Sequence, residues 1–146
     1  MYEHILIATD GGELSEHAVD QGLALAKALG SRVTLFTALS PFHVYSIESY
    51  PEGDQRAEYR RRAEARAEGF LAPARDKAQA LGVACESLAI EHAYPHQAIM
   101  DAAREHGCDL IAMASHGRRG VSALLLGSET LKVLTHSNIP VLVFRR

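Results

Sequence analysis

Two spacings of apolar residues alternate along the chain, and each predicts one kind of secondary structure. Short apolar runs predict strands at residues 4–8, 32–39, 85–91, 110–114 and 141–144. Apolar residues three or four positions apart predict helices between them, at residues 14–29, 55–81, 95–106 and 128–136. Pro73 lies inside the longest helical pattern, so we expect a kink or a division of the helix there.

The alternation of strands and helices predicts the fold class. Apolar strands need helices on both faces, and right-handed crossovers then give a doubly wound, five-stranded parallel sheet of the Rossmann-like α/β class. A chain of 146 residues has the usual length of one domain, and we expect a single domain over residues 1–146. Ligands of such sheets bind at the carboxyl ends of the strands, where the strand order reverses. This rule places Asp10 beside the loop that follows residues 110–114.

The loop after residues 110–114 has the composition of an anion-binding site. It begins with Ser-His-Gly-Arg-Arg-Gly at residues 115–120, and helical spacing resumes at Gly127-Ser128. Glycines let backbone N–H groups approach a phosphate closely, and a helix amino terminus adds unpaired donors and partial positive charge. The segment therefore predicts a phosphate site in which Ser128 supplies a hydroxyl and Arg118 and Arg119 supply cations.

Composition narrows the possible classes of protein. A net charge of −3 argues against a dedicated nucleic-acid binder, and no apolar run approaches the ~20 residues of a membrane span. The first residues lack the basic segment of a signal peptide, so we expect a cytoplasmic protein. Cys85 and Cys108 are expected to be buried, reduced thiols, and no histidine pair has metal-ligand spacing.

The same loop resembles the signature of a known family. Ala114, Gly117 and Gly127-Ser128 fall on the pattern Gly-x2-Gly-x9-Gly-Ser/Thr of the universal stress protein family, with alanine at the first glycine. The opening Ile-Leu-Ile-Ala-Thr-Asp-Gly and the closing Asn-Ile-Pro-Val-Leu-Val-Phe are also similar to the family. The resemblance implies a sheet of the adenine nucleotide alpha hydrolase-like type. It also implies ATP or AMP as ligand, with Mg²⁺ held only through the nucleotide.

The resemblance further implies which residues contact the nucleotide. In relatives that bind ATP, the end of the first strand and its aspartate contact the ligand, and the end of the second strand holds adenine through backbone groups. The loop after the fourth strand and the following helix receive ribose and phosphates. The residues at these positions are Ala8, Thr9, Asp10, Ala38, Met113, Ala114, His116, Gly117, Arg118, Gly127, Ser128, Glu129 and Thr130.

Several of these residues have a second interpretation. Asp10 before two glycines is also typical of a turn or N-cap, and Ser128 could be an N-cap. Gly117 could be an ordinary loop glycine, and His116 and Arg118 could be solvated. The charged run at residues 56–66 mixes signs at helical spacing, which is typical of a solvated helix face and not of a nucleic-acid surface.

Three functions are compatible with the sequence. The first is an adenine-nucleotide-binding regulator or sensor of the stress response, the second a slow ATPase or autophosphorylating enzyme at the same site. The third is an interaction module without nucleotide. Within the sequence there is no nucleophile elbow, Walker-type lysine loop or Cys/His pairing that would indicate an efficient enzyme, so we favour the first.

The final strand predicts an assembly. Residues 141–144 are apolar and would form an edge of the sheet, which is a liability unless the edge is paired. Relatives pair this strand with its copy across a two-fold axis. The resemblance therefore implies a homodimer in which Val141, Val143 and Phe144 make the contact.

Overall fold

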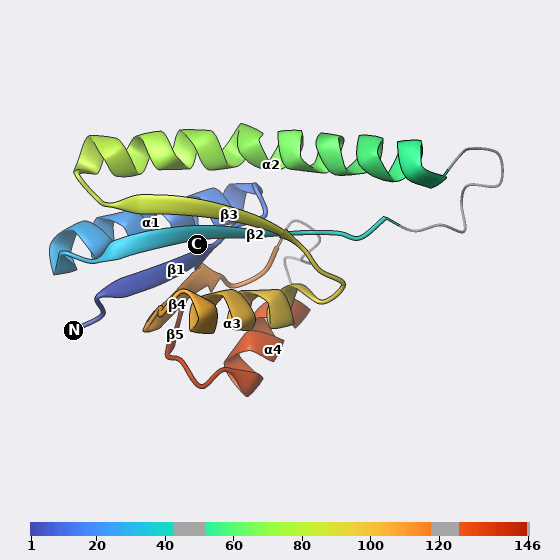
Figure 1. The fold of residues 1–146 in the computed structure, drawn as a ribbon. Helices are drawn as coiled ribbons and strands as arrows, with labels where there is room; N and C mark the ends of the chain where they lie inside the picture. Colours follow the sequence, from blue (N-terminus) through green and yellow to red (C-terminus); the bar gives the residue numbers. More distant parts are fainter. Residues whose placement is uncertain (43–51, 118–125, 146) are drawn as a thin grey trace.

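The computed structural model describes residues 1–42, 52–117 and 126–145 of the chain. Strands and helices alternate along them, as the sequence predicts (Figure 1). The elements are β1 His4–Ala8, α1 Glu13–Leu29, β2 Arg32–Leu39, α2 Glu52–Leu81, β3 Cys85–Glu91, α3 Pro95–Glu105, β4 Leu110–Ala114, α4 Ser128–His136 and β5 Val141–Phe144. The strands have the predicted bounds, and the helix ends lie close to the predicted ones.

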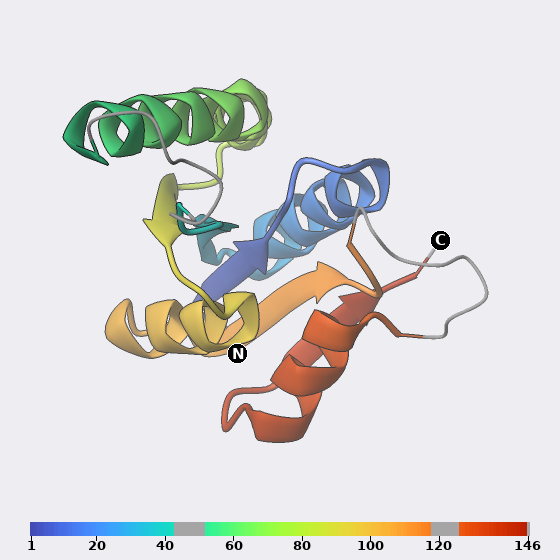
Figure 2. The same ribbon diagram turned by 90° about the vertical axis from the view of Figure 1, so that its right-hand side faces the viewer.

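The strands form one parallel sheet in the order β3-β2-β1-β4-β5. The chain builds β1, β2 and β3 outward in one direction and then returns to β4, so the strand order reverses between β1 and β4. Helices α1 and α2 cover one face and α3 and α4 the other (Figures 1 and 2). This is the doubly wound Rossmann-like α/β fold, and the predicted fold class is confirmed.

The central strand β1 shows how the sheet is held. Successive side chains point to opposite faces, so Ile5 and Ile7 pack with α1 and α2, whereas Leu6 and Ala8 pack in the core on the α3 side. Burial of each large apolar side chain stabilises the fold by roughly 1.5–3 kcal/mol. Because β1 is buried along its whole length, its carboxyl end is held at a defined place.

Helix α2 continues through Pro73 as a single element, so the predicted division of the helix is wrong. Pro73 is exposed, and the opposite face is buried on both sides of it. The buried residues of that face are Ala63, Ala67, Leu71, Ala74 and Ala78. Continuous packing thus offsets the one backbone hydrogen bond that a proline removes.

The exposed side of α2 carries the mixed charges that the sequence indicates. Arg60 pairs with Glu64, and Arg61 and Arg62 both pair with Glu58, at helical spacings of three or four residues. These side chains are largely exposed, which confirms a solvated face, and each pair contributes only a few tenths of a kcal/mol. In the part of the chain that the structure describes, no helix combines the length and the apolarity that a membrane crossing needs.

Both cysteines are free thiols, as the sequence predicts. Cys108 is buried and Cys85 is half-buried. Burial raises the pKa of each thiol to about 11, so both remain protonated and weakly nucleophilic near neutral pH.

Candidate functional site

The carboxyl ends of β1 and β4 meet where the strand order reverses. Asp10 follows β1, and a Cβ atom placed on Gly117, in the loop after β4, would lie 2.7 Å from Asp10 Oδ2. That separation is too short for a real side chain, so the loop reaches the carboxylate because residue 117 is glycine. The structure therefore brings together the two segments that the sequence predicts to meet.

Asp10 is held by the first turn of α1. Its Oδ1 accepts hydrogen bonds from the Gly12 N–H at 2.9 Å and from the Ser15 hydroxyl at 2.8 Å. The turn interpretation of Asp10 is thus correct for Oδ1, although the N-cap of α1 is Gly12. Gly11 has φ +78° and lies against the Phe70 ring, where a Cβ atom would be 2.4 Å from Cδ2. The hydrogen bonds to Oδ1 orient the Asp10 carboxylate so that its other oxygen, Oδ2, faces Gly117.

A second close approach fixes the start of α4. The Gly127 N–H donates to the Ser115 carbonyl at 2.7 Å. A Cβ atom on Gly127 would lie 2.8 Å from the Cβ and 2.9 Å from the Cα of His116. The buried Thr130 hydroxyl donates to the Ala114 carbonyl at 2.9 Å. The first turn of α4 is therefore attached directly to the end of β4.

The amino terminus of α4 has the properties of an anion site. Its N-cap is Gly127, whose backbone is extended, and no side chain among the described residues makes a capping hydrogen bond to the helix. Ser128 is exposed and is the first helical residue, so its interpretation as the N-cap is wrong. The first N–H groups of a helix lack intrahelical partners and carry partial positive charge. Backbone donors and the Ser128 hydroxyl are thus available at this end of α4.

A cleft of about 350 Å³ lies next to these segments, between the end of β2 and α2. The residues that line it are Asp10, Thr37, Ala38, Leu39, Ser40, Tyr59, Ala63, Arg66, Ala67 and Phe70. Its volume lies within the roughly 300–1,000 Å³ of small-molecule sites. Asp10 and Ala38, both predicted from the sequence, line the same cleft. Apolar walls with one carboxylate can hold a flat ring and a polar group attached to it.

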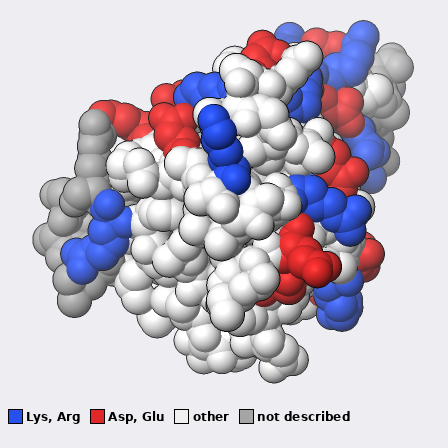
Figure 3. All heavy atoms as spheres, turned by 90° about the vertical axis from the view of Figure 1, so that its left-hand side faces the viewer, with Lys and Arg blue, Asp and Glu red and all other residues white. Residues whose placement is uncertain are grey.

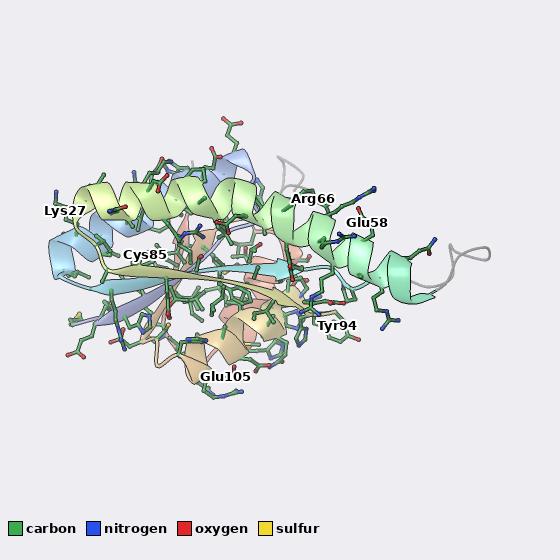
Figure 4. The ribbon with its side chains drawn as sticks, turned by 45° about the horizontal axis from the view of Figure 1, so that its top comes forward. Lys27, Glu58, Arg66, Cys85, Tyr94 and Glu105 are labelled. Carbon is green, nitrogen blue, oxygen red and sulfur yellow. The ribbon has the colours of Figure 1, made fainter. Side chains whose placement is uncertain are left out.

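The contribution of α2 to this cleft was not predicted. Tyr59 donates from its hydroxyl to the Ser40 carbonyl at 2.8 Å and packs against Phe42 with ring centroids 5.4 Å apart. Arg66 is exposed but lines the cleft, and Figure 4 labels it near the middle of α2. Tyr59, Arg66 and Phe70 recur at helical spacing, which is the signal that could have placed them on one face.

The remaining predicted residues differ in what they can offer a ligand. Ala8, Thr9, Met113 and Ala114 are buried, at 8%, 8%, 6% and 5% exposure, so they can contribute only groups near their backbone. The Thr9 N–H already donates to the Phe36 carbonyl at 2.8 Å. His116 is half-buried, and Arg118 lies outside the described residues.

The side chain of Glu129 is directed toward α3. One of its oxygens, Oε2, accepts from the His96 N–H at 2.8 Å and lies 2.9 Å from His96 Nδ1. Its other oxygen, Oε1, lies 3.6 Å from the ammonium of Lys132. The side chain therefore links two helices, a role that spacing within one helix could not reveal.

Two further features complete the surroundings. Within residues 1–42, 52–117 and 126–145, no three His, Cys, Asp or Glu side chains form a group suited to a metal ion. A second groove, of about 390 Å³, lies between α3 and the segment after α4 and includes His96, Arg104 and His136. None of the residues predicted to bind nucleotide lines it.

The fold defines a Rossmann-like α/β protein with a cleft next to the strand-order reversal. The model of the universal stress protein family matches residues 1–145, so the chain belongs to this family. A universal stress protein of Thermus aquaticus is 33% identical over 145 residues, which cover 99% of this chain and all of the relative.

Solved structures agree with this assignment. The structure of a universal stress protein of Methanocaldococcus jannaschii superposes with a TM-score of 0.85 at 27% identity, over 100% of this chain and 97% of that one. A universal stress protein solved in complex with cAMP superposes with a TM-score of 0.70 at 26% identity, over 99% of this chain and 97% of that one.

Proposed function

We propose that this protein binds an adenine nucleotide, ATP or AMP, across the carboxyl ends of β1, β2 and β4. The observation that carries the proposal is the contact of Gly117 with Asp10, which joins the cleft to the glycine-rich start of α4. Adenine occupies the cleft beside Ala38, the Asp10 carboxylate accepts from the ribose hydroxyls, and the amino terminus of α4 receives the phosphates. Mg²⁺ arrives with the phosphates.

A bound adenine nucleotide in a relative supports this ligand class. The protein solved with cAMP shares the fold over almost its whole length. We therefore expect a preference for adenine.

The proposed role is a regulator or sensor of the stress response in the cytoplasm, in which the nucleotide shifts a conformational or partner equilibrium. Among the described residues that line the cleft, Asp10 is the one carboxylate and Arg66 the one cation. Rapid phosphoryl transfer normally uses more charged groups, including a lysine clamp and further metal ligands. We expect slow turnover or none, measured as phosphate release from bound ATP.

The test is calorimetric titration of nucleotide-stripped protein with Mg-ATP and AMP, with Mg-GTP as the control ligand. Wild type is expected to bind ATP with micromolar affinity, and Asp10→Ala and Gly127→Val to lose at least tenfold. Asp20→Ala is the matched control, because Asp20 is an exposed carboxylate on α1 that pairs with Lys77. Its affinity is expected to equal that of wild type.

Absence of both heat and thermal stabilisation at millimolar ATP contradicts the proposal. Such a result favours the third function, an interaction module that binds no nucleotide. The next experiment is then to identify its binding partners. Equal losses in Asp10→Ala and Asp20→Ala also contradict it, because they point to general electrostatics and not to a site.

We also propose that the protein forms a homodimer through β5. This strand is the last in the described sheet, and Leu142 is 36% exposed on it. Leu131 and Leu134 on α4 are also exposed, at 52% and 40%. Figure 3 shows few charged side chains over the lower part of the molecule, where α4 lies in Figure 1. An apolar edge of this kind suits pairing with a second copy of the chain.

A further inference from the structure

The first turn of α4 contains a carboxylate that the nucleotide site does not use. Glu129 follows Ser128, yet its Oε2 accepts from the backbone N–H of His96 at 2.8 Å and lies 2.9 Å from the His96 ring nitrogen Nδ1. The His96 side chain is only 18% exposed, whereas that of Glu129 is 37% exposed. The contact joins the amino termini of α3 and α4.

Helix α3 has no side-chain cap of its own at its amino terminus. Its N-cap is Tyr94, which makes no capping hydrogen bond, and its first residue is Pro95, which has no N–H. The His96 N–H is therefore the first backbone donor of the helix, and Glu129 supplies the acceptor from another element. A negative charge at this position also complements the helix dipole.

The contact also orients α4. Thr130 is attached to the end of β4 through its hydrogen bond to Ala114, and Glu129 is attached to α3. Two consecutive residues of the first turn are thus held by two different elements. Together they set both the position of the turn and its rotation about the helix axis, and so the direction of the N–H groups after Gly127.

The same contact removes an electrostatic obstacle. A carboxylate in the first turn of a helix is attracted to the amino-terminal N–H groups and competes there with a phosphate. The hydrogen bonds to His96 hold the Glu129 carboxylate against α3 instead. The start of α4 then keeps its donors for an external anion.

We propose that His96 and Glu129 are positioning residues of the phosphate site, acting as a lock between α3 and α4 that sets the amino terminus of α4. This inference rests on the proposed function, because it assigns the lock to the nucleotide that the site is proposed to bind. Neither side chain touches the ligand. Replacement of the His96 side chain, on a different helix, must therefore also weaken nucleotide binding, although less than replacement of Glu129, because the backbone N–H of residue 96 remains.

The experiment measures ATP affinity by calorimetry in Glu129→Ala, His96→Ala and the double variant, at a temperature well below the unfolding midpoint of each. Glu129→Ala is expected to bind about tenfold more weakly, and His96→Ala about threefold more weakly, because the backbone N–H of residue 96 still donates to Glu129 in the latter. The double variant is expected to bind no more weakly than Glu129→Ala, which already removes both hydrogen bonds. Glu129→Gln keeps an oxygen that accepts from the His96 N–H and is expected to recover affinity to within about threefold of wild type. Lys132→Ala removes the other partner of Glu129 and is the control with unchanged affinity.

A second readout does not depend on nucleotide. The amide NMR signals of Ser128 and Thr130 are expected to shift, and their hydrogen exchange to accelerate, in His96→Ala but not in Lys132→Ala. Unchanged amide signals, or wild-type affinity in His96→Ala with loss only in Glu129→Ala, overturn the lock. If wild type binds no nucleotide, the proposed function fails, whereas the amide signals still decide whether His96 sets the start of α4.

Discussion

Gly127 shows how single residues determine the geometry of the site. Its amide donates to Ser115, and the space that a side chain would occupy is filled by the Cα and Cβ atoms of His116. Any larger residue must push the loop and the helix apart. The amino terminus of α4 would then move away from the end of β4, although Gly127 lies outside the two apolar core clusters.

Gly127→Ala is therefore expected to lower ATP affinity by at least tenfold while the protein stays folded. Calorimetry measures the affinity, and thermal unfolding checks the fold. Gly69→Ala is the control, because no atom lies within 4 Å of a Cβ atom at this exposed position of α2. That variant should bind as wild type does and gain up to about 1 kcal/mol of stability. Unaltered affinity in Gly127→Ala contradicts the role given to the close approach.

Residue types predict part of the site because their chemistry is local. A glycine or an aspartate between a strand and the next helix indicates a close approach of the backbone or a charged end, so Asp10, Gly117 and Gly127 could be found from the sequence. The direction of the Glu129 carboxylate could not, because it depends on where α3 places His96. Arg66 was assigned to the solvated face for the same reason, since the sequence does not give the rotation of α2 against β2.

At the scale of elements, the attachment of α4 to β4 depends on a buried hydroxyl. Thr130 is 2% exposed and donates to the carbonyl at the end of β4, at 2.9 Å. The fold itself follows from apolar periodicity, which is why strand bounds are predicted so well. This cross-element hydrogen bond has no such periodic signal, and sequence analysis took Thr130 for a nucleotide contact only by resemblance.

Thr130→Val is expected to destabilise the protein by roughly 1–3 kcal/mol, because the isosteric side chain leaves the Ala114 carbonyl buried without its donor. Denaturant unfolding measures the change. Thr135→Val is the matched control on the same helix, since its hydroxyl also donates to a carbonyl, that of Leu131, but is exposed to water. Its unfolding free energy is expected to change by no more than about 0.5 kcal/mol. Equal effects of the two substitutions would mean that the buried hydrogen bond has no special role.

At the scale of the whole molecule, the amino end of the sheet should make stability depend on pH. His4 is buried in β1, and its Nε2 lies 2.7 Å from the Thr34 hydroxyl. Burial, with a further contribution from the charge of Arg32, lowers the pKa of His4 below the ordinary 6.5, although the nearby Glu86 opposes this. His106, which also faces it, both raises the pKa through its backbone and lowers it through its charge.

A lowered folded-state pKa means that the unfolded chain binds the proton more tightly than the folded protein does. The stability that comes from burying neutral His4 is therefore fully present above pH 6.5 and is lost as the pH falls below that value. Denaturant unfolding midpoints on either side of pH 6.5 measure this loss of stability. In His4→Gln the midpoint is expected to fall less on acidification than in wild type. His136→Gln, at an exposed position of α4, is the control with the wild-type fall. An identical pH dependence in His4→Gln and wild type would refute this origin of the effect.

Assembly through β5 can be tested at single backbone groups. The Pro140 and Phe144 carbonyls accept from the Ile111 and Ser115 N–H groups of the loop and strand beside them. Backbone groups of neighbouring strand residues point to opposite edges, so those of Val141 and Val143 point to the open edge. A partner strand would bind there, and not at residue 142, whose groups face β4.

Val143→Pro should therefore abolish the dimer and leave the fold intact, because proline is tolerated on an edge strand when its missing N–H faces solvent. Sedimentation at micromolar concentration measures the mass, and unfolding measures the stability. Leu142→Pro provides the contrast, since it removes a donor to β4 and should destabilise the monomer itself by about 3 kcal/mol or more. A wild-type protein that is strictly monomeric contradicts the proposed homodimer. If Val143→Pro remains dimeric, the interface does not lie at the open edge of β5. The exposed leucines of α4 are then the next residues to substitute.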